Sequence, residues 1–244
     1  MENDSLAGRG RVDYTSFQRG FAMTSSSVNT LNLRQLVLVP ALISLGVTLL
    51  RLVGELNRWS PLLFGREAGG GGAIVGISWL IPIFGIYFAL KLGRMGHGPT
   101  SGWRTASASL LAVLVAAVVI VAMYLIGQSF VLQAASGVLG SLAALYVMSK
   151  SWPALFKTLL CYAFAVRIPV AIVMLFAIYG NWGTHYELGP PGMPEMAPFV
   201  KWVAIGLIPQ MTAWIATTVV FGSLFGGIAV ALAGKGAKQA AQTA

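Results

Sequence analysis

Residues 106–149 read ASASLLAVLVAAVVIVAMYLIGQSFVLQAASGVLGSLAALYVMS, and this stretch decides the fold class. It consists of two apolar segments, each close to the roughly 20 residues that an α-helix needs to cross a bilayer. Only Gly127 and Gln128 separate the two segments. We therefore expect two transmembrane helices joined by a tight turn.

The same length criterion predicts six spans and an all-α fold, a polytopic transmembrane helical bundle. The final span can be extended to residue 233, because residues 202–234 contain no charged residue. Such a stretch is too long for one upright helix and too short for two helices with a loop, which favours a long helix kinked at Pro209 whose tail leaves the membrane. The predicted spans are 34–54, 72–92, 106–127, 129–149, 154–180 and 198–222.

The composition of the whole chain agrees with this class. Its 244 residues are 57% hydrophobic and 9% charged, with a mean hydropathy of +0.77. Soluble domains carry about 25% charged residues, and disordered chains have low hydrophobicity, so both classes are excluded. Cys161 is the only cysteine, which excludes an intrachain disulfide and a thiolate metal site.

The basic residues predict how the chain is oriented. A net charge of +9 and a pI near 10.1 can indicate nucleic-acid binding, but in a membrane protein Lys and Arg collect in cytoplasmic loops. We therefore expect no nucleic-acid partner and a multi-pass protein of the cell membrane with both termini in the cytoplasm. On this topology the inner side carries Arg9, Arg11, Arg19, Arg34, Lys91, Arg94, Arg104, Lys150, Lys157, Lys235 and Lys238, and the outer side carries Arg51, Arg58, Arg66 and Lys201.

Three parts of the chain follow from these boundaries. Residues 1–33 are polar and are predicted to form a flexible cytoplasmic segment that contains no signal-peptide core. Residues 34–233 form the transmembrane helical domain, and residues 234–244 form a cytoplasmic tail. Small residues four apart, at Gly222 and Gly226, are typical of close helix packing, within the chain rather than between copies of it.

Arg167 and Gln210 are the candidate binding residues. Arg167 falls near the middle of the fifth span, where a charge costs at least about 2.5–3.5 kcal/mol on insertion scales. The six predicted segments contain no Asp or Glu that could pair with it. Gln210 lies at a similar depth in the sixth span, so its side-chain oxygen is the predicted acceptor for the guanidinium. Two interpretations stay open: an arginine that binds an anion, a lipid headgroup or a second subunit, and one that holds helices together or reaches the interface.

The segment 180–198 is the most distinctive predicted outer loop. It contains four prolines, which favour an ordered cap over the helix ends, with Trp182 and Tyr186 as interfacial anchors. His185 and Glu187 could face one ion, but two ligands do not make a metal site. We therefore predict no metal site, no catalytic residue and no cofactor.

The stretch from Met148 to Pro169, MSKSWPALFKTLLCYAFAVRIP, resembles the Yip/Yif family of small polytopic membrane proteins. The likeness lies in a Phe-Lys pair, a Tyr-Ala pair several residues later and a proline inside the span. It covers about a third of the chain, and the family usually has five spans rather than six. The resemblance implies an all-helical bundle without catalytic residues. Eukaryotic members of the family are linked to vesicle traffic and Rab-type GTPases.

Two functions are compatible with the sequence. The first is a non-enzymatic integral membrane protein that organises membrane partners or lipids, with anionic lipid at its cytoplasmic face and a protein partner or a second copy as further partners. The alternative is a transporter or channel for a small or anionic solute, in which Arg167 lines the path. Ion-coupled transporters commonly carry acidic groups inside their spans, and the predicted spans carry none.

Overall fold

The computed structural model describes residues 32–70 and 72–243, and the side chains of these residues as far as Gly234. The described residues are mostly helical and form no strand. The predicted all-α bundle with six spans is confirmed, because six helices are long and apolar enough to cross a membrane. These spans are Leu33–Leu56 (α2), Ile77–Arg94 (η2, Ile77–Trp79, and α3, Leu80–Arg94), Gly102–Ile126 (α4), Phe130–Ser149 (α5), Pro153–Gly180 (α6) and Pro198–Gly234.

The sixth span is assembled from four consecutive pieces. They are α7 (Pro198–Lys201), the π-helix η4 (Trp202–Leu207), α8 (Ile208–Met211) and α9 (Ala213–Thr243). The long final helix is as predicted. Its irregular part, however, is not confined to Pro209 but runs from the π-helix that begins at Trp202 to the break at Thr212.

One predicted boundary differs from the structure. The second span begins at Ile77 rather than at residue 72, because the glycine-rich stretch before it forms a turn in which Gly72 has a positive φ. Helix α9 continues to Thr243, since the predicted tail from residue 234 is rich in Ala, Lys and Gln, which favour helix. The predicted polar segment 1–33 lies, except for its last two residues, outside the described part of the chain.

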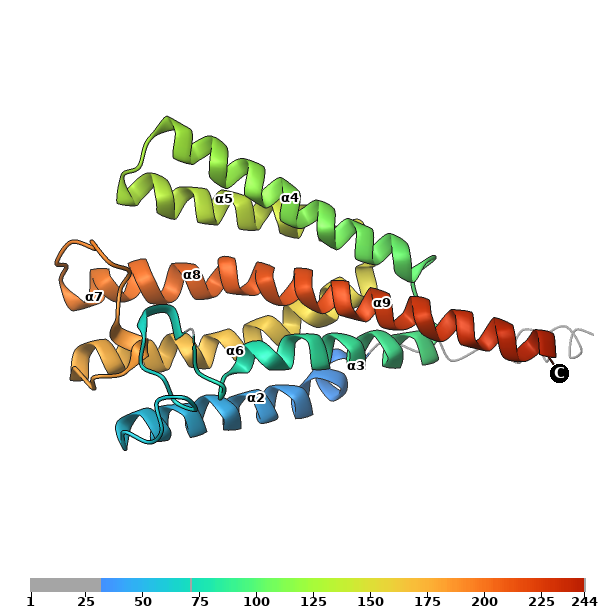
Figure 1. Ribbon diagram of the computed structural model, residues 1–244, viewed down its shortest axis with the longest axis horizontal. Helices are drawn as coiled ribbons and strands as arrows, with labels where there is room; N and C mark the ends of the chain where they lie inside the picture. Colours follow the sequence, from blue (N-terminus) through green and yellow to red (C-terminus); the bar gives the residue numbers. More distant parts are fainter. Residues whose placement is uncertain (1–31, 71, 244) are drawn as a thin grey trace, which may run out of the picture. The chain divides into compact units, whose positions relative to one another are not determined.

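Helix α9 is the central element of the bundle (Figure 1). It packs against α3, α4, α5 and α6, while α2 packs against α6. Helices α4 and α5 form the predicted hairpin, and a serine caps the start of each: Ser101 accepts from the N–H of Arg104, and Ser129 from that of Leu132. The segments 57–79, 127–129 and 181–197 lie toward one end of the bundle, which we call the loop end (left in Figure 1).

Glycines let α3 and α9 approach closely. A Cβ added at Gly85 would collide with the backbone of Gly222, and one added at Gly226 would lie 2.7 Å from the carbonyl oxygen of Gly85. The predicted small-residue pattern at Gly222 and Gly226 therefore serves packing within the chain.

This contact gives a first testable prediction. We expect Gly85→Ala to lower the free energy of unfolding by about 1–3 kcal/mol, because the new methyl group must separate two helix backbones. Gly93→Ala on the same helix is the matched control, since its Cβ would meet nothing within 4 Å. It should leave stability unchanged or raise it by up to about 1 kcal/mol. Thermal unfolding in detergent distinguishes the two, and equal midpoints would contradict the packing argument.

Candidate functional site

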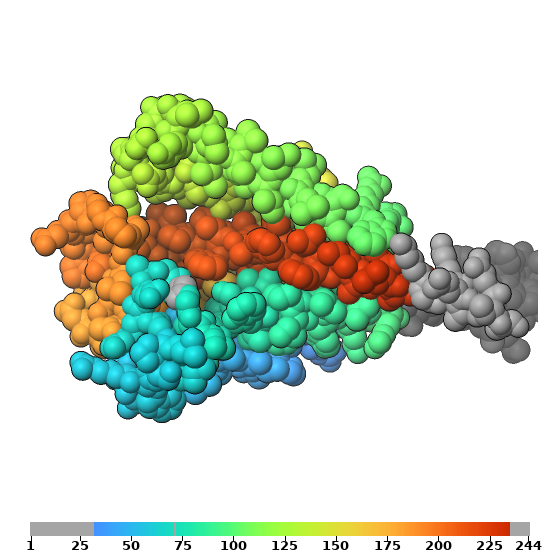
Figure 2. All heavy atoms as spheres, viewed as in Figure 1, coloured from blue at the N-terminus to red at the C-terminus, as the bar shows by residue number. Residues whose placement is uncertain are grey.

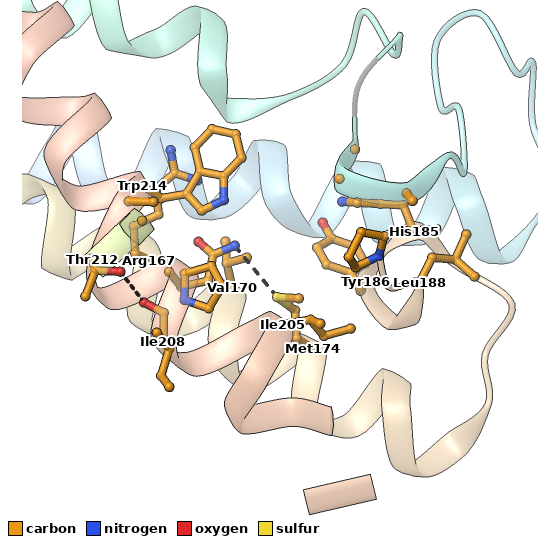
Figure 3. A pocket seen from close by; sticks show the side chains of 18 of the residues that line it. Arg167, Val170, Met174, His185, Tyr186, Leu188, Ile205, Ile208, Thr212 and Trp214 are labelled. Atoms are coloured by element: carbon orange, nitrogen blue, oxygen red, sulfur yellow. Dashed lines mark hydrogen bonds between the residues drawn. The ribbon is translucent and has the colours of Figure 1, made fainter. Parts of the chain in front are cut away.

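A cavity of about 550 Å³ lies inside the bundle at the loop end. Its walls come from α2, α5, α6, the segment 181–197 and the distorted sixth span. Figure 3 shows its two ends: Arg167 and Trp214 lie at one, and His185 and Tyr186 at the other. The wall between the ends is apolar and includes Val170, Met174, Ile205 and Ile208.

The irregular part of the sixth span forms one wall of this cavity. The π-helix η4 contributes Ala204 and Ile205, and the helix is interrupted at Thr212, whose φ and ψ are −123° and −79°. The hydroxyl of Thr212 donates to the carbonyl of Ile208 at 2.7 Å, which satisfies an acceptor beside the break. π-Helical segments and broken membrane helices occur preferentially at functional sites that line a cavity.

Arg167 is held by α6 at the mid-span end of the cavity. Its side chain is 4% exposed, and its guanidinium carbon lies 4.7 Å from the centre of the Trp214 ring. Its Nε atom is buried and donates no hydrogen bond to the described residues. A cation–π contact of this kind is worth about 2 kcal/mol when desolvated.

The hydroxyl groups of Tyr162, Thr212 and Thr217 form hydrogen bonds with other partners. Tyr162 Oη lies 2.7 Å from Ser44 Oγ, Thr212 donates within its own helix, and Thr217 donates to the carbonyl of Ala213 at 2.8 Å. Each forms a hydrogen bond that does not involve the guanidinium.

The predicted hydrogen bond between Arg167 and Gln210 is wrong. The Nε2 atom of Gln210 lies 3.7 Å from the sulfur of Met174, and its Oε1 atom is buried and accepts no hydrogen bond from the described residues. The sixth span is irregular on both sides of Gln210, with the π-helix η4 before it and the break at Thr212 after it. The depth of Gln210 in the membrane therefore did not determine whether its side chain faces Arg167. The structure nevertheless brings both residues to the same cavity.

A second polar cluster lies at the loop end of the cavity and is fully hydrogen bonded at its centre. Glu55, 1% exposed, accepts from Nε of Arg51 at 2.7 Å and from the backbone N–H of His185 at 2.9 Å. Its Oε1 also lies 2.6 Å from Nδ1 of His185. Arg51 donates further to the carbonyls of Gly65 and Gly70. Glu55 therefore joins α2 to the segment 181–197, and Arg51 joins α2 to the segment 57–79.

The segment 181–197 is folded against the helix ends, as the sequence predicts, but a different contact holds it there. Tyr186 is buried rather than interfacial, and its hydroxyl donates to the carbonyl of Thr48 at 3.4 Å. Burial, reinforced by the nearby carboxylate of Glu55, raises the pKa of this tyrosine. Glu187 accepts from the backbone N–H groups of Trp182 and Gly183.

Glu55, the centre of this cluster, is the buried residue that sequence reasoning missed. The predicted first span ended at residue 54, whereas α2 continues to Leu56 and buries the carboxylate. The spacing of Arg51 and Glu55, four residues apart on one helix face, was the available signal. Its partner His185 lies 130 residues away in the sequence and could not be assigned from spacing.

The histidine in this cluster predicts a pH dependence. Burial lowers the pKa of His185 below its ordinary value, although the bond to Glu55 acts the other way; Arg51, which already neutralises that carboxylate, also lowers it. The unfolded chain then binds a proton that the folded chain does not, so stability should fall as the pH drops below about 6.5.

Thermal unfolding between about pH 7.5 and 5.5 tests this expectation, a range above that in which carboxylates ordinarily titrate. The wild type should lose stability over the range, and His185→Gln should flatten the loss. An unchanged slope in His185→Gln would contradict the assignment.

Comparison with known proteins adds no relative: no family model, curated protein or solved structure matches the chain. The resemblance of residues 148–169 to the Yip/Yif family stays a prediction.

Proposed function

We propose that this multi-pass membrane protein is non-enzymatic and binds a small amphiphile, such as a single-chain lipid, inside its bundle. The observation that carries the proposal is the cavity of about 550 Å³ between its apolar helices. Ligand pockets of about 300–1,000 Å³, mostly apolar with a few polar groups, are the usual size and character of small-molecule sites. The polar side chains that line this cavity, which include Arg167, Gln210 and His185, could form hydrogen bonds to a ligand.

Access from the bilayer supports a lipid-like ligand. Figure 2 shows the surface hollowed between α5 and the η4–α8 part of the sixth span. Residues of both elements, including Ala134 and Gly137 of α5 and Ile208 of α8, line the cavity. The helices also expose large apolar side chains, such as Leu110 and Leu114 on α4, as contact with acyl chains requires. An amphiphile could thus enter sideways from the membrane.

The break in the sixth span favours a second candidate function, a transporter for a small anionic solute. Transporters commonly form their substrate sites from discontinuous helices near the middle of the membrane. Here the break at Thr212 lies beside Trp214, on which Arg167 packs. A water-soluble anion rather than a lipid would then occupy the same cavity.

The proposed location is the cell membrane with both termini in the cytoplasm. The basic residues Arg94, Arg104 and Lys150 lie at the end opposite the loop end, where they would meet anionic lipid of the inner leaflet. Reporter fusions at the two termini should both report cytoplasm. A terminus found outside would mean that an odd number of helices crosses the membrane.

Filling the cavity tests the proposed function. Gly137 lines the cavity, and a Cβ at this position meets nothing within 4 Å, so Gly137→Phe should fold and occupy the space. Gly46→Phe is the matched control: its Cβ is equally unobstructed, but Gly46 is an exposed residue of α2 that does not line the cavity.

The measurement is native mass spectrometry of protein extracted from its membranes in mild detergent. The wild type and Gly46→Phe should each retain one amphiphile, and Gly137→Phe should lose it. A bare wild type, or equal retention in all three proteins, would contradict binding in this cavity.

A further inference from the structure

Resting on the proposed function, we propose that the ligand is an anion whose carboxylate or phosphate group binds Arg167 at the mid-span end of the cavity. This names the chemical class of the ligand and the group that recognises it. The argument rests on unused hydrogen-bonding capacity, on the charges around the cavity and on its length.

The first observation is the missing partner of Arg167. Its Nε–H is buried and unsatisfied, although arginine presents five N–H donors that match the planar geometry of carboxylate and phosphate groups. The ring of Trp214 lies 4.7 Å from the guanidinium carbon. Because Arg167 also lines the cavity, an acceptor that comes from outside the chain could meet its guanidinium there.

The second observation is the sign of the charge. Among the described residues that line the cavity there is no Asp or Glu. Arg51, which also lines it, is already paired with Glu55 at 2.7 Å. The charge of Arg167 therefore has no counter-charge in the wall, and in a low-dielectric site it favours an anion over a neutral or cationic ligand.

The third observation is the shape of the space next to Arg167. Met174 lies seven residues further along α6, which corresponds to roughly 10 Å of helix, and the wall over this distance is mostly apolar. Beyond it the cavity continues to Leu188 and the prolines of the loop end. An acidic group at Arg167 with a single alkyl chain directed toward the loop end fits this arrangement.

Gln210 indicates that the ligand also brings a hydrogen-bond donor. Gln210 is 7% exposed, and its buried Oε1 atom accepts no hydrogen bond from the described residues. A hydroxyl near the acidic group of the ligand, or a water molecule carried with it, would supply that donor.

Fluorescence quenching by brominated amphiphiles tests the inference with defined probes. Purified protein in a neutral detergent is titrated with bromoundecanoate and with bromoundecanol, which share a chain and differ in charge. Trp214 is the reporter, and a Trp214→Phe variant identifies its share of the signal. At about pH 8 the fatty acid is ionised, and the wild type should bind it at least about tenfold more tightly than the alcohol.

Arg167→Gln should remove this preference by weakening the acid while leaving the affinity for the alcohol unchanged. Arg167→Lys keeps the charge but not the planar fork and should retain part of the preference. Bound alcohol in both variants also shows that they are folded around an intact cavity.

The possible outcomes distinguish the anion site at Arg167 from the proposed amphiphile cavity. Equal affinity for acid and alcohol in the wild type, or a preference that survives Arg167→Gln, would overturn the anion site while leaving the cavity as an amphiphile site. No saturable quenching by either probe would overturn the proposed function itself.

A third probe, inorganic phosphate, distinguishes the source of the anion. Displacement of bromoundecanoate by phosphate from the wild type would support the site at Arg167 and favour the water-soluble solute of the transporter candidate. Resistance to phosphate, with the preference for acid retained, would support a lipid-like anion.

Discussion

Glu55→Ala is expected to lower the free energy of unfolding by about 3–5 kcal/mol, the cost of removing one partner from a buried ion pair. The substitution leaves the charge of Arg51 buried and uncompensated and deprives the backbone N–H of His185 of its acceptor. Because the carboxylate joins α2 to the segment 181–197, the loop should also become sensitive to protease. Thermal unfolding in detergent and limited proteolysis measure the two effects.

Two variants control this experiment. Glu55→Gln retains an oxygen that can accept from Arg51 and should lose less stability than Glu55→Ala. Glu187→Ala removes a more exposed carboxylate from the same loop, where it accepts from the N–H groups of Trp182 and Gly183, and should cost about 0.5–1.5 kcal/mol. If Glu55→Ala and Glu187→Ala were equally mild, the buried cluster would not be what holds the loop.

Arg167→Met is expected to act in the opposite direction and to stabilise the ligand-free protein by about 1–4 kcal/mol. The charge of Arg167 is desolvated, and its Nε lacks a partner among the described residues, so an apolar side chain removes a cost that the contact with Trp214 only partly offsets. Binding sites commonly sacrifice stability in this way. Unfolding is measured after exhaustive exchange into fresh detergent.

Arg51→Met is the matched control, because Arg51 is equally buried but donates to Glu55 and to the carbonyls of Gly65 and Gly70. The same substitution should therefore destabilise the protein at Arg51 and stabilise it at Arg167. A loss at Arg167 as large as that at Arg51 would show that Arg167 holds the helices together.

The six spans were predictable from sequence because length and apolarity alone determine whether a helix can cross a bilayer. The hairpin of α4 and α5 followed from the two residues that interrupt its apolar run. The mid-span position of Arg167 identified it as an unusual residue but left open whether its side chain is buried or reaches the interface. These features depend on local composition, which a single sequence displays.

The contacts of the site were less accessible to sequence reasoning. The π-helix η4 and the break at Thr212 alter the rotation of the last span, so Trp214 rather than Gln210 meets the guanidinium. The cluster at Glu55 forms because α2 continues past the predicted end at residue 54 and because a histidine from a distant loop packs against it. Both arise from tertiary packing, which the periodicity of a single helix does not encode.

The most direct test of the central claim is to locate the bromine atom in a structure of the protein bound to bromoundecanoate. Anomalous scattering should place the bromine inside the cavity between α5 and α8, with the carboxylate within hydrogen-bonding distance of the guanidinium of Arg167. Bromine found only on the outer, lipid-facing surface, with no acyl density in the cavity, would contradict the account.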